Sequence, residues 1–553
     1  MLTRPPAGLA RLGVILAALS LFAITFREGI ERGYDQTIPI GTVSRVALAI
    51  SSYLTEMVYQ EHGYVLDSTI FHKLESRGIS RDPDVVARLG MKVPENLKNA
   101  VFIDEILDSM VRDIPNYPAR PDLSGFGTDD VGLVTFTKLA FFLFGRHVRA
   151  FYYLFFLIYG ATVITALIER RDSPLSQCAI IGFMAVMYIF FFHSPQFLNT
   201  KSDALGTVWS PHFITQLGVI PLLHIVLMMI NRVPFTASKL SAVAFQSLIV
   251  AFVLHIRATG VYLPIVLSVI AVGYCLLEWM NAHREKIHVS ILSILKPSWP
   301  AFVSIAIVIL FIQVSLSARH RVYLQEGGLG YHTYWHSIYY ALQMHPQFYK
   351  RFGAMHENLT GDAMPIAAIR HYLKEHPEVD KPEIYRPTGG FKSGHMDRLA
   401  RLAFMDFVSQ HPKFVLETFV KYKAPVMFEY IAETISAEWA HLSSSSRGAA
   451  IVAALLAAAW LSRRPEETRI YLQFTVCVCI MALAAFGMIF LTVPGLNDPE
   501  TILAVQFAAL LLLILGLSRA FRRVHVPAAG RRGRGPTFSS QYMYVSWPWP
   551  RLG

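Results

Sequence analysis

Three acidic positions in the first third of the chain have side chains that could take part in catalysis. Asp35 stands alone, Asp104 is followed by Glu105, and Asp129 is followed by Asp130. A carboxylate can act as the general base that takes the proton of an acceptor hydroxyl, and a second carboxylate can hold a divalent cation against a donor phosphate. Asp35, Asp129 and Asp130 are therefore candidate catalytic residues for a transferase, and such carboxylates could also hold a divalent cation.

Each of these positions also has an ordinary structural role open to it. Asp104 lies in a helical pattern, where a solvated helix face is favoured over catalysis. Asp129 and Asp130 directly precede an apolar stretch, where Asp is a good N-cap and is favoured by the helix dipole. That pair could cap a helix and also act as a base, and Asp35 could close a loop turn.

A set of basic residues is suited to binding a lipid phosphate: His255, Arg257, Arg319, His336 and Lys421. Aromatic residues surround some of them, and aromatic and basic side chains also anchor membrane proteins at the headgroups without a specific ligand. Arg257 is the strongest candidate, because it lies in a very short turn between two apolar runs, where a charge needs a partner.

The elements that must position these residues are long apolar helices. Of 553 residues, 53% are hydrophobic and 16% are charged, whereas about 25% are charged in typical soluble domains. The apolar residues form runs long enough to cross a bilayer, which argues against a soluble enzyme, a disordered scaffold and a nucleic-acid factor. We predict an all-α polytopic membrane protein with these ten transmembrane helices: 9–26, 150–168, 174–192, 213–230, 240–254, 261–280, 299–316, 448–461, 470–493 and 501–517.

The distribution of Lys and Arg predicts the orientation. The short loops on one side contain most of these residues, whereas those on the other side contain only Lys201 and Arg257. Arginines after the last span account for most of the net charge of +11, which therefore does not indicate a nucleic-acid partner. By the positive-inside rule both termini are cytoplasmic, and we expect a multi-pass protein of the bacterial cytoplasmic (inner) membrane.

This orientation divides the chain into six parts. They are an N-terminal anchor helix (1–26), a first outer, periplasmic loop (27–149), spans two to seven (150–316), a second outer helical region (317–447), spans eight to ten (448–517) and a basic cytoplasmic tail (518–553).

Both outer regions contain helical patterns. Residues 101–110 and 399–420 repeat apolar positions at helical spacing, with breaks predicted at His345-Pro346 and His411-Pro412. The stretch 131–144 is short for a span and contains a lysine, so we predict a helix in the plane of the outer interface.

The spans contain few groups that could couple transport to an ion. His224 is the one ionisable side chain deep in a span, and we interpret it as a hydrogen-bonded packing residue. Gln246 and Gln313 are the other candidates for a polar interior. The four cysteines all lie in apolar runs, which indicates neither a disulfide framework nor a metal site. A proton-driven carrier is therefore disfavoured.

The layout resembles the GT-C superfamily of polytopic glycosyltransferases, which use polyprenyl-phosphate-linked sugars. The resemblance is carried by a first span, a long outer loop with acidic residues, many further spans and a second outer region. Members of that family place a catalytic Asp or Glu in the first outer loop. The matching positions are Asp35 and, further along, Asp129-Asp130.

This resemblance implies transfer of a sugar from a polyprenyl-phosphate donor to an acceptor at the outer face of the membrane. Two alternatives stay open: a flippase or carrier for lipid-linked glycans, and a non-catalytic membrane assembly subunit whose outer loops bind a partner. In each case the bilayer is an expected partner, and for the transferase the polyprenyl-phosphate-linked sugar is another.

Overall fold

The computed structural model describes residues 7–34, 53–54, 56–58, 60–61, 100–116, 131–170, 173–193, 211–284, 290–318, 334–357, 359, 363–385, 390–492 and 499–525. Within these residues the protein is all α, apart from one isolated bridge between Tyr385 and Phe391. The predicted all-α class is therefore confirmed for the described part of the chain.

Each of the ten predicted spans forms a helix. These helices are α1 (Ala7–Tyr34), α7 (Arg149–Glu169), α8 (Pro174–His193), α11 (Val219–Ile230), α12 (Ala237–Ile256), α13 (Tyr262–Arg284), α15 (Trp299–Ala318), α23 (Ser444–Ser462), α24 (Pro465–Thr492) and α25 (Pro499–His525). Short segments precede two of them: α10 (Pro211–Ile214) and η4 (Thr215–Gly218) lead into α11, and α14 (Ile291–Leu295) and η6 (Lys296–Ser298) lead into α15.

Seven helices among the described residues are long and apolar enough to cross a membrane, which supports a multi-pass membrane protein. They are α1, α7, α12, α13, the continuous run from α14 through α15, α24 and α25. The apolar parts of α8, α11 and α23 are shorter, so their crossing stays a prediction.

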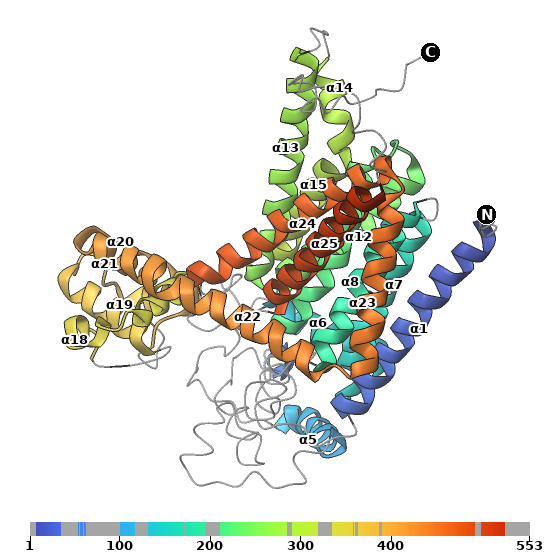
Figure 1. Cartoon of the computed structure of the whole chain (residues 1–553). Helices are drawn as coiled ribbons and strands as arrows, with labels where there is room; N and C mark the ends of the chain where they lie inside the picture. Colours follow the sequence, from blue (N-terminus) through green and yellow to red (C-terminus); the bar gives the residue numbers. More distant parts are fainter. Residues whose placement is uncertain are drawn as a thin grey trace.

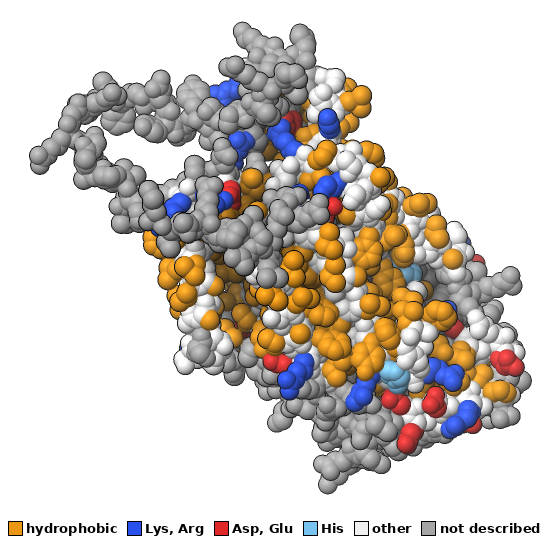
Figure 2. Space-filling view, turned by 90° about the vertical axis from the view of Figure 1, so that its right-hand side faces the viewer, with side chains coloured by type: hydrophobic (Ala, Val, Ile, Leu, Met, Phe, Trp, Pro, Cys, Tyr) orange, Lys and Arg blue, Asp and Glu red, His pale blue; other side chains and the backbone are white. Residues whose placement is uncertain are grey.

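The helices pack into a bundle with one large apolar core (Figure 1). Among the largest fully buried side chains are Phe136, Phe155, Phe183 and Phe507. Other large apolar side chains, such as Ile168, point outward and are exposed. Figure 2 shows hydrophobic side chains across the middle of one face and charged side chains toward its two ends. Such a belt is what a bilayer would cover.

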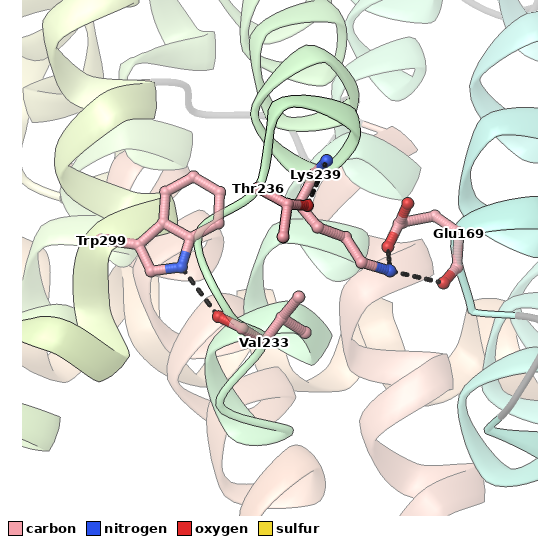
Figure 3. A network of polar contacts seen from close by, with 5 residues as sticks. All are labelled: Glu169, Val233, Thr236, Lys239 and Trp299. Atoms are coloured by element: carbon pink, nitrogen blue, oxygen red, sulfur yellow. Dashed lines mark hydrogen bonds and ion pairs between the residues drawn. The ribbon is translucent and has the colours of Figure 1, made fainter.

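Polar contacts gather several of the basic loops at one end of the bundle. The ammonium of Lys239 in α12 pairs with the carboxylate of Glu169 at the end of α7, and the Trp299 indole donates to the carbonyl of Val233 at 2.9 Å (Figure 3). Arg232 pairs in turn with Glu278 of α13. The loops that the positive-inside rule assigns to the cytoplasm therefore meet in space, whereas the side of the membrane that they face stays a prediction.

The second outer region folds into a lobe beside the bundle, with hydrophobic clusters of its own (Figure 1). Its elements are α17 (Tyr334–Tyr340), η7 (Ala341–Met344), α18 (Phe348–Phe352), α19 (Ala363–Glu375), η8 (Pro382–Ile384), α20 (Ser393–Gln410), α21 (Pro412–Glu417), the π-helix η9 (Thr418–Lys423) and α22 (Ala424–His441). The predicted breaks at His345-Pro346 and His411-Pro412 are confirmed. From the lobe, α22 leads back across the lower end of the bundle to α23.

The first outer region contributes α5 (Ala100–Asp113), η2 (Ile114–Asn116) and α6 (Val131–Phe144). α5 confirms the helix predicted from 101–110. α6 packs against α7 and α12, and most of its first half is buried. The structure therefore fixes α6 to the bundle, and its orientation relative to a membrane stays a prediction.

Candidate functional site

The C-terminal end of α12 carries two of the predicted phosphate-binding residues, and α6 packs directly on it. A Cβ atom added to Gly132 would lie less than 3.0 Å from the carbonyl group of His255 and from the nitrogen of Ile256. Because those atoms belong to the backbone, only a glycine permits the approach. The first turn of α6 and the last turn of α12 therefore form a fixed pair.

Arg257 ends α12 and is buried against the protein. Its backbone is extended and its N–H donates to the carbonyl of Val253 at 2.9 Å, so the helix stops there. The side chain is only 7% exposed. A guanidinium stays charged at physiological pH, and burying it is costly unless polar or anionic groups surround it. This burial agrees with the expectation that Arg257 has a structural or ligand partner.

His255 of α12 also contacts Thr135, which lies one turn after Gly132 in α6. Its Nε2 lies 3.4 Å from the hydroxyl oxygen of Thr135, and its ring packs on Phe311 of α15 with centroids 6.0 Å apart. The side chain is half-buried. His255 is therefore held at the junction of three helices, two residues before Arg257 in the chain.

The first turn of α6 adds positive character to this end. The first N–H groups of a helix have no acceptor within it, and the helix dipole places a partial positive charge there. Together with Arg257 and His255, this arrangement favours an anion, either a carboxylate of the chain or a ligand phosphate. Asp129 and Asp130 immediately precede α6 in the sequence and lie outside the described residues.

Two further contacts fix segments of the first outer region to α6 and to the start of α7. Lys138 of α6 pairs with Glu56 at 2.7 Å, and Glu56 is almost fully buried. Asp104 of α5 accepts a hydrogen bond of 2.6 Å from the N–H of Val148, which directly precedes α7. Burial raises the pKa of Asp104 to about 6, and this hydrogen bond opposes the rise.

The contact to Val148 corrects the interpretation of Asp104 as part of a solvated helix face. Glu105 and Asp108 are exposed as expected, but Asp104 is half-buried and joins α5 to the start of α7. The residue is next to exposed acids in sequence, so local pattern alone favours solvent. The acceptor role depends on a contact 44 positions away in the chain.

The other predicted phosphate-binding residues within the described chain belong to the lobe. His336 lies in α17 and is buried, and Asp397 accepts hydrogen bonds from the N–H groups of Trp335 and His336 at 2.6 and 3.4 Å. Lys421 is exposed, with its ammonium 5.2 Å from the ring centre of Tyr422. The predicted set is thus divided between the end of α12 and a separate hydrophobic cluster.

Asp35 and Arg319 lie outside the described residues, as does the Asp129-Asp130 pair, so their predicted roles stay predictions. Within the part of the chain that the structure describes, no cluster of three or more His, Cys, Asp or Glu residues could hold a metal ion. A divalent cation therefore has no described ligand set here.

Two carboxylates that the sequence did not single out are engaged in interhelical contacts. Glu28 of α1 accepts a hydrogen bond of 2.8 Å from the hydroxyl of Tyr188 in α8. Glu438 of α22 is buried and accepts from the amide of Gln506 in α25. For Glu28, the sequence offered one indication of such a contact: this residue follows the first apolar run directly, where α1 continues as a helix to Tyr34.

Comparison with known proteins identifies no relative of this chain. No known protein family, curated protein or solved structure matches the chain. What is shown is an all-helical protein with seven candidate membrane spans, a buried arginine at the end of α12 and a glycine contact that binds α6 to it.

Proposed function

We propose that the chain is a GT-C-like glycosyltransferase that moves a sugar from a polyprenyl-phosphate donor to an acceptor hydroxyl at the outer face of the membrane. The observation that carries the proposal is the contact between α6 and α12 at Gly132. It places the last turn of α12, which is followed by the buried Arg257, against the helix that begins directly after Asp129-Asp130 in the sequence.

The two sides of this contact supply complementary chemistry. A carboxylate of Asp129 or Asp130 would take the proton of the acceptor hydroxyl. At the same time the oxygen of that hydroxyl would attack the anomeric carbon of the sugar. The bond from that carbon to the phosphate oxygen breaks, and polyprenyl phosphate leaves with an additional negative charge. Arg257 and the first turn of α6 would stabilise that charge, because donors placed where charge develops lower the barrier.

The remaining predicted residues have supporting roles in this proposal. His255 is two residues before Arg257 in the chain and would contact the donor phosphate. Asp35 is a second candidate for the base or for binding a cation. The second outer region contains the other three predicted residues, His336, Lys421 and Arg319. They would contact lipid headgroups or the acceptor, apart from the residues at the end of α12.

The proposal is tested with the full-length protein in nanodiscs and polyprenyl-phosphate-linked sugars carrying a radioactive label. We expect Asp129→Asn combined with Asp130→Asn to lower transfer by about 10²–10⁴-fold, the usual contribution of a general base. Arg257→Gln should weaken binding of polyprenyl monophosphate itself, whereas the two Asp substitutions should leave that binding in place. Asp108→Asn is the matched control, because Asp108 is an exposed acid of α5 outside the proposed site.

Three outcomes would overturn the proposal. Full transfer by the Asp35→Asn, Asp129→Asn, Asp130→Asn triple variant would exclude these carboxylates as catalytic residues. Movement of labelled lipid across liposomes without sugar transfer would favour a flippase or carrier. Stable co-purification with a partner, unchanged by the same substitutions, would favour an assembly subunit.

A further inference from the structure

Three buried polar side chains lie along the interface of α7, η4–α11 and α12. They are Gln216 in η4, His224 in α11 and Gln246 in α12, and each is no more than 1% exposed. Buried amide and imidazole groups in an apolar bundle are destabilising unless their polar atoms are hydrogen-bonded. The partners of these atoms therefore need to be identified one by one.

Gln246 uses both hydrogens of its amide. One is donated to the carbonyl of Thr162 at 3.0 Å and the other to Nδ1 of His224 at 3.2 Å. Because Nδ1 accepts, the neutral imidazole carries its hydrogen on Nε2. The expected packing role of His224 is thus confirmed for one ring nitrogen.

Four polar atoms of these three side chains have no hydrogen-bond partner among the described residues. They are Nε2 of His224, Oε1 of Gln246, and both Oε1 and Nε2 of Gln216. The set contains donors as well as acceptors, so neither an anion nor a cation alone would satisfy it. A water molecule can donate and accept, and waters inside proteins usually bind such atoms.

Two buried hydroxyls at this interface are hydrogen-bonded within their own helices. Thr162 donates to the carbonyl of Tyr159 at 2.8 Å, and Ser247 donates to that of Val243 at 2.6 Å. Short side chains reach the preceding turn of their own helix, whereas glutamine and histidine project away from it.

We propose that the interface of α7, η4–α11 and α12 is an internal water-binding site, with its waters held by Gln216, His224 and Gln246. Gln216 and His224 are eight residues apart along one helical run, or about 12 Å at 1.5 Å per residue. The site therefore extends over about two turns of that run. The water at Nε2 gives His224 a proton acceptor inside the bundle.

The site is tested directly by electron cryomicroscopy of the full chain in nanodiscs at a resolution that shows water. We expect water density within hydrogen-bonding distance of Nε2 of His224, Oε1 of Gln246 and the amide of Gln216. Rearranged side chains that pair directly with each other, without water density, would overturn the proposal.

Radiolytic hydroxyl labelling provides a second, independent test, because radicals formed from bound water modify the residues beside it. We expect labelling within residues 215–230 of the wild type despite their burial, and its loss when Gln216→Leu is combined with His224→Leu. Gln313→Leu is the matched control, since Gln313 is exposed on α15 and should leave that labelling unchanged. Absence of labelling in the wild type would contradict a hydrated site.

The melting temperature of the Gln216→Leu variant shows whether the buried amide of Gln216 is hydrated or dry. Leucine is close to glutamine in size, so the substitution mainly removes the polar atoms. A hydrated amide already has its hydrogen bonds, so its loss should lower the melting temperature. A dry amide is destabilising, so its replacement by leucine should raise the melting temperature, which would overturn the proposal.

Discussion

Asp104 connects α5 to the start of α7, and its burial changes how its carboxylate contributes to the stability of the fold. Its oxygen accepts the N–H of Val148, and burial raises its pKa from 3.8 to about 6. A raised pKa means that the folded state binds the proton more tightly than the unfolded state. The contribution of Asp104 to stability is therefore greatest below about pH 4 and is lost as the pH rises through 6.

We predict that α5 is held more firmly to α7 at pH 5 than at pH 7.5. Asp104→Asn keeps an oxygen acceptor for Val148 and removes the partly buried charge. It should strengthen the junction at pH 7.5 by about 1–2 kcal/mol, because solvent screens part of the effect. Hydrogen exchange of residues 100–113 measures this effect, after correction for the intrinsic pH dependence of exchange. Glu105→Gln, at an exposed position, should change nothing; equal effects of the two substitutions would refute the role of Asp104.

Gly132 is the second residue whose replacement has a defined consequence. Gly132→Ala would place a Cβ atom against the backbone of His255 and Ile256, which cannot move as a flexible side chain would. We expect a loss of about 1–3 kcal/mol of stability or more, the usual cost of overpacking. A thermal unfolding curve in detergent measures it. Gly273→Ala in α13 is the control, because nothing lies near its added Cβ, and it should be neutral or slightly stabilising.

Among the secondary-structure elements, the π-helix at Thr418–Lys423 changes which side chains of its segment are buried. It turns the buried face so that Phe414, Thr418, Lys423 and Met427 all point inward. The ammonium of Lys423 has no hydrogen-bond partner among the described residues and lies 5.4 Å from the ring centre of Phe419. Burial lowers the pKa of Lys423 from 10.5 to about 7.

A lowered lysine pKa means that the unfolded state binds the proton more tightly. The contribution of Lys423 to stability is therefore fully present above about pH 10.5 and is lost as the pH falls through 7. We predict that wild-type stability rises between pH 7 and pH 9.5, and that Lys423→Met removes this rise and raises stability at pH 7 by about 3–5 kcal/mol. Thermal unfolding at both pH values measures it. Lys421→Met, at an exposed lysine, should retain the wild-type pH profile; a Lys423→Met profile identical to wild type would contradict the prediction.

The helices were predictable from sequence to a greater extent than the contacts between them. Ten apolar runs became ten helices, because a backbone in an apolar environment must satisfy its hydrogen bonds internally. The π-helix was not predictable: a regular period of 3.6 from Phe414 places position 421 inward, and the wider turn places 423 there instead. The position of Asp104 and the contact at Gly132 also depend on packing between segments far apart in sequence.

The candidate site was predictable only in its residue types. The short turn at Arg257 correctly indicated an unusual arginine, and the structure shows it to be buried. His336 and Lys421 were assigned to the same phosphate site because both lie in the outer regions, but they belong to a lobe with its own core. Sequence position predicts the side of the membrane and does not predict which outer residues converge.

For the whole molecule, the two ends of the bundle lead to a prediction about orientation. Arg146 is exposed near α5, and Arg463 is exposed in the loop after α23. In a chain whose four cysteines are replaced by serine, we expect Arg146→Cys to react with a membrane-impermeant maleimide in intact cells or spheroplasts. Arg463→Cys should react only after the membrane is opened. The reverse pattern would invert the proposed orientation, and labelling of both from outside would show that the number of crossings differs.

The contact at Gly132 also sets an order of events during synthesis. α6 is made before α7, but the backbone that it must meet belongs to residues 255 and 256, which leave the ribosome only after α8 and α11. The first turn of α6 therefore cannot reach its final neighbours while the nascent chain ends before the last turn of α12. Until then the apolar face of α6 needs another cover, and a chaperone or the insertion machinery itself is the natural candidate. Chains arrested just before and just after residues 255 and 256 leave the ribosome should differ in the protease sensitivity of residues 131–144.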